Sequence, residues 1–258
     1  VVIIGRNEEK AKATISKIKS AVTNANVSYL IADLSLMAQV KRVADEFRAK
    51  YDRLDVLVNN AGMIFEKRMV TKEGLEMTFA LNHINYFYLT HLLLDTLKAT
   101  GTPAQKARII NVASEAHRFG NVNLDDIQNE KGYFGLRVYG HSKGMNIMHA
   151  YELHRRLSTE NANVTINALH PGTVRTGFGQ NNRGIMKYVT QLFGRFGLSP
   201  EQGADNSIYL ASSPDVEGVS GAYFIKREAK QPNEFVQNPD HWQKLWTYSE
   251  DILTQLKV

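Results

Sequence analysis

Tyr139 and Lys143 lie four residues apart in the segment RVYGHSKGMN, residues 137–146. On a helix, positions i and i+4 share one face, so the phenol and the ammonium would be neighbours. A nearby ammonium favours the phenolate and lowers the pKa of a tyrosine from its usual value of about 10. A phenol tuned in this way is a good proton donor to a carbonyl, and the lysine is long enough to reach a sugar hydroxyl.

The spacing alone is weak support for such chemistry, because in a chain with 11 tyrosines it arises by chance at roughly even odds. Stronger support comes from small and polar residues that follow three apolar runs. They are the tetrapeptide NNAG (59–62), Ser114 after the run 107–112, and HPGTVRT (170–176). Each has a simpler explanation as a turn or a helix cap, but ligands of parallel sheets bind where the strands end.

Six short apolar runs are expected to form the strands of one sheet. They are continuously apolar rather than alternating, which is typical of parallel strands covered on both faces. Amphipathic patterns between them predict helices, and this alternation makes a doubly wound α/β fold with a parallel sheet. The expected strands are 1–5, 27–32, 54–59, 107–114, 164–170 and 221–225, and the expected helices are 7–20, 36–51, about 72–98, about 137–158 and 201–211.

Several segments have a more specific expectation. Residues 173–200 are Gly-rich and partly amphipathic, which is typical of a substrate lid. The tail 232–257 contains both tryptophans and predicts a packed terminal helix. Asp33 or Ser35 is expected to cap the second helix, and Ser199 followed by proline predicts a sharp start for the helix at 201.

Composition and charge exclude several classes of protein. Acidic and basic residues are interleaved, so the net charge of +5 forms no basic stripe and we expect no nucleic-acid partner. The absence of cysteine excludes disulfides, thiolate metal sites and a cysteine nucleophile. No apolar run approaches the roughly 18 residues that cross a bilayer, and the opening VVIIGR is not a signal peptide. The histidines lack the spacing of metal ligands, so we predict no metal. We expect a single domain over residues 1–258.

In their order along the chain, NNAG, Ser114, Tyr139-x-x-x-Lys143 and PGTVRT resemble the short-chain dehydrogenase/reductase family over essentially the whole chain. The resemblance implies a Rossmann-type, three-layer α/β/α fold and hydride transfer between a nicotinamide dinucleotide and a carbonyl or alcohol carbon. Finer features are similar to the retinol dehydrogenases and WW-domain oxidoreductases of that family. They are FALNHINYFYLTHLLL (79–94), RIINVASEAH (108–117), LDDI (124–127), ALHPGTVRT (168–176) and KLWTYSE (244–250).

The resemblance implies four catalytic residues. Tyr139 matches the acid/base, and Lys143 matches the lysine that binds the nicotinamide ribose and lowers the pKa of the tyrosine. Ser114 matches the residue that holds the substrate oxygen. Asn82 matches the asparagine that anchors a proton-relay water, with Asn85 as the alternative.

The resemblance also implies a set of cofactor contacts. Arg6 ends the first apolar run, where a cation suits the 2′-phosphate of NADP(H) better than NAD(H), so we expect NADP(H). The positions that match cofactor contacts, besides Tyr139 and Lys143, are Arg6, Asp33, Leu34, Asn59, Ala61, Gly62, Pro171, Gly172, Val174 and Thr176.

One departure from the family pattern affects the fold and the cofactor. The opening strand and the turn Thr-Gly-x-x-x-Gly-x-Gly, which places backbone N–H groups on a pyrophosphate, do not occur in the sequence. The fold is therefore expected to lack its first βα unit, leaving unpaired edges in the middle of the sheet and weak dinucleotide binding. We expect the chain to be an incomplete copy of a parent about 30–50 residues longer.

Two classes of function follow from these patterns. The first is an NADP-dependent oxidoreductase acting on CH–OH groups of a lipophilic alcohol, aldehyde or ketone, with Tyr139 as acid/base. The second is a non-catalytic dinucleotide-binding or regulatory protein on the same scaffold, which would not need Ser114, Tyr139 and Lys143 together. The apolar faces of helices 72–98 and 137–158 permit a homodimer, although core packing explains them equally well. The expected location is cytoplasmic or unknown, because a membrane anchor would lie upstream of residue 1, and membrane attachment is left open.

Overall fold

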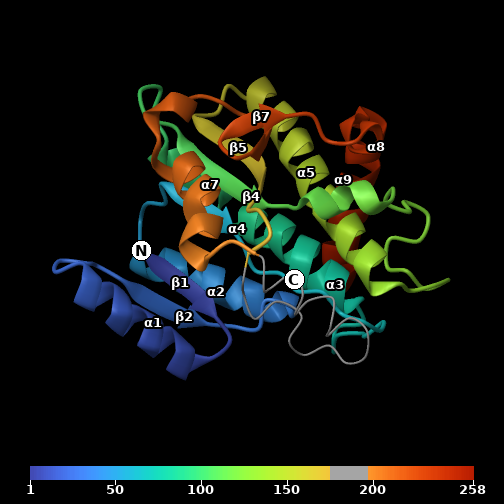
Figure 1. Cartoon of the computed structure of the whole chain (residues 1–258), viewed down its shortest axis with the longest axis horizontal. Coiled ribbons are helices and arrows are strands. Elements are labelled where there is room, and N and C mark those ends of the chain that lie inside the picture. The colour runs from blue at the N-terminus through green and yellow to red at the C-terminus, as the bar shows by residue number, and fades with distance from the viewer. Residues whose placement is uncertain (175–196) are drawn as a thin grey trace.

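The structure is a computed structural model that describes residues 1–174 and 197–258. The described residues form two sheets flanked by helices (Figure 1). The smaller sheet pairs two parallel strands, and the larger has the order β3-β4-β5-β6-β7, in which only β7 runs antiparallel to its neighbour. The strands are β1 (Val2–Gly5), β2 (Ser28–Ile31), β3 (Val56–Asn59), β4 (Ala107–Val112), β5 (Val164–His170), β6 (Tyr223–Ile225) and β7 (Glu228–Lys230).

Helices cover both faces of the larger sheet (Figure 1). Neighbouring residues of β4 point to opposite sides, with Ile109 in the core shared with α4 and α5 and Ile110 in a second core under α7. This arrangement confirms the predicted three-layer α/β fold. The helices are α1 (Glu8–Ala21), α2 (Met37–Lys50), α3 (Met77–Phe79), α4 (Asn85–Thr100), α5 (Gly135–Thr159), α7 (Pro200–Ser212), α8 (Glu234–Gln237) and α9 (Pro239–Leu256), with a π-helix η1 (Ala80–Ile84) and 3₁₀ turns η2 (Glu115–Phe119) and η3 (Pro214–Val216). Among the described residues no helix is both long and apolar enough to span a membrane.

The break between the two sheets lies between β1 and β3. Within residues 1–174 and 197–258, neither strand pairs with a partner on that side. Val58, in the middle of β3, is 42% exposed, which is unusual for a valine of a central strand. The predicted unpaired edges in the middle of the sheet are therefore confirmed.

The long helix expected over residues 72–98 begins later than predicted. Residues 70–76 form a turn closed by a bridge between Val70 and Glu76, with Gly74 at φ +83°. The carboxylate of Glu76 then accepts the backbone N–H groups of Thr78 and Phe79, both at 2.8 Å, and caps the start of α3. The helix continues through the π-helical turn η1 into α4, so its register shifts by one residue at that turn.

Two other helix boundaries also differ from expectation. Neither Asp33 nor Ser35 caps α2, because the Asp33 carboxylate bonds to the backbone and hydroxyl of Ser35 instead. The first turn of α2 is capped by Glu73, whose carboxylate accepts from the backbone of Met37 at 2.7 Å and of Ala38 at 3.0 Å. The single terminal helix expected over 232–257 is divided into α8 and α9 at Pro239, which cannot continue a helix. By contrast, the predicted start at Ser199 is confirmed by a complete capping box with Gln202.

Candidate active site

The carboxyl ends of β3, β4 and β5 lie at one edge of the larger sheet. The parallel register pairs Asn59 with Asn111 and Asn111 with Ala168, so the segments that follow these strands leave the sheet side by side. These segments contain NNAG, Ser114 and Pro171-Gly172. Helix α5, which carries Tyr139 and Lys143, packs against β4 and β5. The structure therefore brings the predicted catalytic segments to one place.

Lys143 is the centre of this arrangement. Its side chain is buried, and Nζ donates to the backbone carbonyl of Val112 at 2.9 Å, at the end of β4. Nζ also lies 5.5 Å from the centroid of the Tyr139 ring, one helical turn away. A Cβ placed on Gly62 would stand 3.2 Å from Nζ and 3.3 Å from Oδ1 of Asn82, so the small residue of NNAG leaves room for both side chains.

Burial dominates the electrostatics of both residues of the pair. Burial lowers the pKa of Lys143 to about 7, because the ammonium loses its hydration without gaining a carboxylate. Burial also raises the pKa of Tyr139 well above its usual 10, and a hydrogen bond with Ser114 opposes this rise. The expectation that Lys143 lowers the pKa of Tyr139 is therefore wrong for this arrangement. Near neutral pH Tyr139 keeps its proton, as a proton donor to a carbonyl must.

Ser114 follows β4 in an extended conformation and begins the turn η2. Its Oγ accepts the backbone N–H of Ala116 at 3.1 Å. Helix α5 approaches this turn closely at Gly140, where a Cβ would stand only 2.4 Å from the carbonyl oxygen of Ala116. Gly140 directly follows Tyr139, so the missing side chain at this position lets Tyr139 reach Ser114.

Asn82 lies in the π-helical turn η1 and is fully buried. Its Oδ1 accepts the backbone N–H of Met63 and its Nδ2 donates to the carbonyl of the same residue, both at 2.9 Å. Nδ2 also donates to Oγ of Ser142 at 3.0 Å, and Ser142 donates to the carbonyl of Tyr139 at 2.7 Å. Asn82 thus ties the loop after NNAG to the helical turn of Tyr139. The alternative, Asn85, bonds to its own helix at Leu81.

Asn59, the first residue of NNAG, is buried at the end of β3. Its Nδ2 donates to Oγ1 of Thr90 at 3.0 Å and to Oδ1 of Asn111 at 2.9 Å. Its own Oδ1 is buried and has no hydrogen-bond partner among the described residues. A buried acceptor in this condition requires a donor, such as a ligand or a further stretch of backbone. Ala61 and Gly62 are half-buried in the same loop.

The residues expected at the adenosine end follow β1 and β2. Arg6 and Asp33 are close in the fold, because the N–H of Ala32 donates to the carbonyl of Gly5 at 3.0 Å. Arg6 is exposed, and its guanidinium makes no hydrogen bond or ion pair within the described part of the chain. Asp33 and Leu34 are half-buried, with Leu34 packed against the core.

The segment after β5 contains the remaining expected contacts. Pro171 and Gly172 form the turn, with Gly172 at φ +83°, and Val174 forms a bridge with Leu198. Thr176 lies outside the described residues, and so does most of the lid predicted over 173–200.

Tyr86 is a neighbour of the site whose position the sequence analysis missed. Its ring centroid lies 5.7 Å from Nζ of Lys143, and its buried hydroxyl has no partner among the described residues. The signal was its spacing of four residues from Asn82, which places both on one helical face. Tyr86 belongs to the helix 72–98, one of the two helices weighed above as a pairing surface. On these two helices Tyr86, Phe87, Leu93, Met145 and Met148 are buried within the fold, as core packing requires.

Comparison with known proteins matches residues 1–185 to the family described as short chain dehydrogenase. The human polyprenol dehydrogenase is 35% identical over 259 residues, which cover 100% of this chain and 78% of the relative. Human retinol dehydrogenase 14 is 42% identical over 231 residues, which cover 87% of this chain and 66% of that protein. The WW domain-containing oxidoreductase of Pongo abelii is 34% identical over 99% of this chain and 62% of its own length.

Solved structures agree at the level of the fold. An uncharacterised protein of Mycobacterium paratuberculosis superposes with a TM-score of 0.74 at 24% identity, covering 98% of this chain and 84% of the other. A short chain dehydrogenase of Escherichia coli CFT073, complexed with NADPH, has a TM-score of 0.62 at 20% identity and covers 87% of this chain and 84% of the other.

Proposed function

This chain belongs to the short-chain dehydrogenase family, and from that premise we propose that it transfers a hydride between NADP(H) and a lipophilic alcohol or carbonyl compound. The observation that carries the proposal is the convergence on Lys143. Tyr139 and Ser114 are hydrogen-bonded to each other within reach of its buried ammonium, and Gly62 and Asn82 close the other side.

In this proposal Tyr139 is the general acid for carbonyl reduction. Its raised pKa keeps the phenol protonated, so the hydroxyl donates its proton to the substrate oxygen as negative charge develops there. Ser114, already hydrogen-bonded to Tyr139, donates a second hydrogen bond to the same oxygen and fixes its position. When bound, a reduced nicotinamide supplies the hydride to the carbonyl carbon. In the direction of alcohol oxidation, Tyr139 receives the proton back.

Lys143 and Asn82 support the acid rather than replace it. The Lys143 amine lies beside the Tyr139 ring and next to Gly62, where it can donate to the hydroxyls of a ribose. Asn82 holds the backbone of residue 63 and Ser142 in place, so it keeps the loop and the helix at a fixed separation.

Two features of the chain favour a dinucleotide and its phosphorylated form. Oδ1 of Asn59 has no partner among the described residues, and the small residues Ala61 and Gly62 beside it let a ligand approach the backbone. The guanidinium of Arg6, which pairs with no other described side chain, suits the 2′-phosphate of NADP(H), since arginine binds phosphate through two parallel hydrogen bonds. Asp33, Leu34, Pro171, Gly172, Val174 and Thr176 are proposed to complete the contacts.

The proposed class of substrate rests on the relatives. Their names refer to retinol and polyprenol, both long apolar alcohols. The natural test is a steady-state assay of the full chain that follows loss of NADPH absorbance with decanal, retinal and the hydrophilic control glyceraldehyde. We expect turnover of the two apolar aldehydes with NADPH, slower rates with NADH, and little with glyceraldehyde.

A Ser114→Ala variant should lower the rate at least 100-fold, the usual range for losing one such donor. Equal rates with glyceraldehyde would refute the lipophilic class, and equal rates with NADH would refute the cofactor preference. Binding of NADPH in a calorimeter without turnover of any aldehyde would refute the enzymatic function in favour of a non-catalytic dinucleotide-binding protein.

A further inference from the structure

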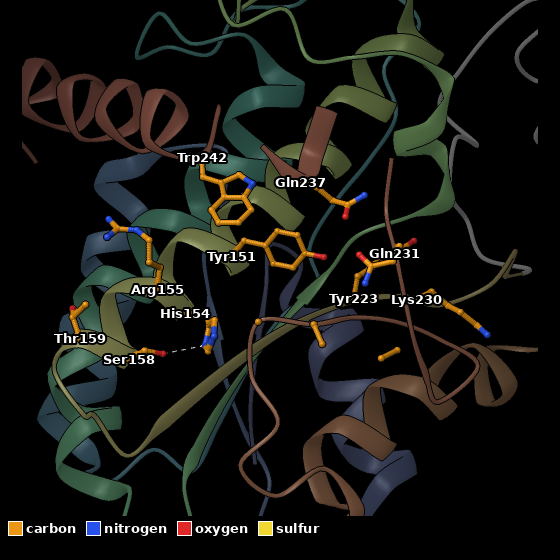
Figure 2. Close-up of a pocket in the computed structure, with 13 residues that line it drawn as sticks. Tyr151, His154, Arg155, Ser158, Thr159, Tyr223, Lys230, Gln231, Gln237 and Trp242 are labelled. Atoms are coloured by element: carbon orange, nitrogen blue, oxygen red, sulfur yellow. Dashed lines mark hydrogen bonds between the residues drawn. The ribbon is translucent and has the colours of Figure 1, made fainter. Parts of the chain in front are cut away.

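A second cavity lies away from the residues described above, between the C-terminal half of α5, the hairpin β6–β7, and helices α8 and α9 (Figure 2). Its volume is about 710 Å³, which is within the range of about 300–1,000 Å³ that small-molecule sites occupy. One face of α5 supplies five of its residues, at positions 151, 154, 155, 158 and 159. None of the residues proposed above for catalysis or for binding the cofactor lines it.

Aromatic rings form one wall of this cavity. Tyr151 packs edge-on against Trp242, with the ring centroids 5.1 Å apart, and Figure 2 shows both rings beside the open space. The hydroxyl of Tyr151 points away from Trp242, and it makes no hydrogen bond within the part of the chain that is described. The indole N–H of Trp242 is used by the carbonyl of Val236 at 2.6 Å, so the ring is fixed with an apolar surface towards the cavity. A flat aromatic ring of a ligand can pack against such a wall.

Among the described residues, the polar side chains of the lining are two cations, an imidazole, two glutamine amides and four hydroxyls, and none is a carboxylate. Arg155 lies at one end and Lys230 at the other (Figure 2). Each of these cations is paired with one carboxylate. Glu152 accepts from Nε and Nη2 of Arg155 at 2.8 and 2.7 Å, and Glu228 lies 2.6 Å from Lys230. Nη1 of Arg155 makes no hydrogen bond with any described residue, so one donor of the guanidinium is left for an anion.

His154 is placed so that one ring nitrogen stays available. Its Nδ1 lies 3.0 Å from Oγ of Ser220 and 3.4 Å from Oγ of Ser158, while Nε2 has no partner among the residues described. The imidazole ring fills space that any side chain at residue 221 would occupy, because a Cβ on Gly221 would stand 2.3 Å from Cδ2 of His154. Gly221 also has φ +70°, a conformation that other residues rarely adopt. The local backbone therefore admits the imidazole to the cavity.

We propose that this cavity is a second binding site, for a small aromatic carboxylate whose ring stacks in the wall of Tyr151 and Trp242 and whose carboxylate is held at the Arg155 end. A neutral molecule of the same shape would keep the apolar contacts and lose the charge-assisted hydrogen bonds. The site is independent of the proposed oxidoreductase activity.

The cavity wall also contacts the loop of Ser114. The hydroxyl of Tyr223 donates to Oε1 of Glu115 at 3.1 Å, and its ring lies edge-on against His117, 5.3 Å between centroids. Nδ1 of His117 in turn bonds to the carbonyl of Ser114 at 2.7 Å. A carboxylate bound in the cavity therefore lies on the far side of the turn that carries Ser114, without entering the catalytic site.

Isothermal titration calorimetry of the full chain with 2-naphthoate and with the uncharged 2-naphthamide tests the proposal. We expect 2-naphthoate to bind at least tenfold more tightly than 2-naphthamide. Arg155→Met should abolish this preference, and Ala229→Trp, which places an indole in the cavity from the edge strand β7, should abolish binding of both probes. The matched control Arg53→Met removes an exposed arginine that does not line the cavity and should change neither affinity.

Three results would overturn the proposal: no binding of 2-naphthoate at millimolar concentration, equal affinity for both probes, or unchanged binding in Ala229→Trp. Loss of binding in Tyr139→Phe would also overturn it, because that result would place the probe in the catalytic site. If Ala229→Trp fails to fold, as judged by circular dichroism, Arg155→Met decides the question, and a preference that survives Arg155→Met refutes the site.

Discussion

Replacing Lys143 by methionine is expected to stabilise the fold while removing catalysis. Methionine has nearly the same length, so it fills the same buried space without the ammonium. The pKa of Lys143 falls from the usual 10.5 to about 7, which corresponds to about 5 kcal/mol against the charged form. The lost hydrogen bond to Val112 and the contacts with two aromatic rings offset about 2 kcal/mol of this. The variant should therefore be more stable by about 3 kcal/mol at pH 7.

The pH dependence distinguishes this cause from better packing. Above pH 10.5 the lysine is neutral in both the folded and the unfolded chain, so its burial has no electrostatic penalty. As the pH falls towards 7, the unfolded chain binds a proton that the folded chain does not, and the wild type loses stability relative to the variant. Between pH 9.5 and 7.5 the difference in free energy of unfolding between the variant and the wild type should widen by roughly 2–3 kcal/mol, at most 1.36 kcal/mol for each pH unit. Below about pH 6, where the lysine is protonated in both states, this difference should be constant.

Urea denaturation followed by tryptophan fluorescence measures the free energy of unfolding of the wild type and of Lys143→Met at several pH values. Lys98→Met is the matched control, because Lys98 lies at the surface and pairs with Glu160. The free energy of unfolding of Lys98→Met should stay within about 0.5 kcal/mol of the wild-type value at every pH. A Lys143→Met variant that is less stable than the wild type at pH 7, or whose difference from the wild type does not change with pH, would show that the lysine is not desolvated as described.

Three further substitutions test the surroundings of the site. Tyr86→Phe removes a buried hydroxyl without a partner in the described chain and should raise the free energy of unfolding by about 1 kcal/mol in urea denaturation; a loss of stability would reveal a bond that the hydroxyl makes. Gly140→Ala should lower kcat at least tenfold, because the added methyl group pushes α5 away from Ala116. The control Gly132→Ala, where a Cβ meets open space, should leave kcat unchanged, and equal losses of kcat in the two variants would contradict the argument. Arg6→Ala should weaken NADPH binding in calorimetry by about tenfold or more and leave NADH unchanged; equal weakening of both would exclude a 2′-phosphate contact.

Much of the architecture was predictable because it depends on local patterns. Continuously apolar runs gave the order and approximate bounds of β1 to β6, since a strand buried on both faces has no polar residues to alternate. The absence of the Gly-rich turn led to the expectation of unpaired edges, which the separation of β1 from β3 confirms. The short strand β7 was missed because its residues, Glu-Ala-Lys, are exposed and have no strand-like pattern.

The features that the sequence did not reveal depend on distant contacts. The π-helical turn at Asn82 follows from the loop of Met63, 19 residues earlier, which binds the asparagine side chain. The direction of the Tyr139 pKa was predicted wrongly, because spacing along a helix says nothing of how much water the fold excludes. The second cavity is formed by α5 together with segments about 60 to 90 residues away from it in the chain, so no single motif marks it.

The central claim is that Tyr139 donates the proton in a hydride-transfer reaction. The most direct test compares the full chain with Tyr139→Phe in single-turnover oxidation of NADPH by decanal, with NADPH binding measured separately by calorimetry. The account predicts that the rate falls by at least 100-fold, as expected for loss of a general acid, while the affinity for NADPH and the unfolding curve change little. A Tyr139→Phe variant that oxidises NADPH within tenfold of the wild-type rate would contradict the claim.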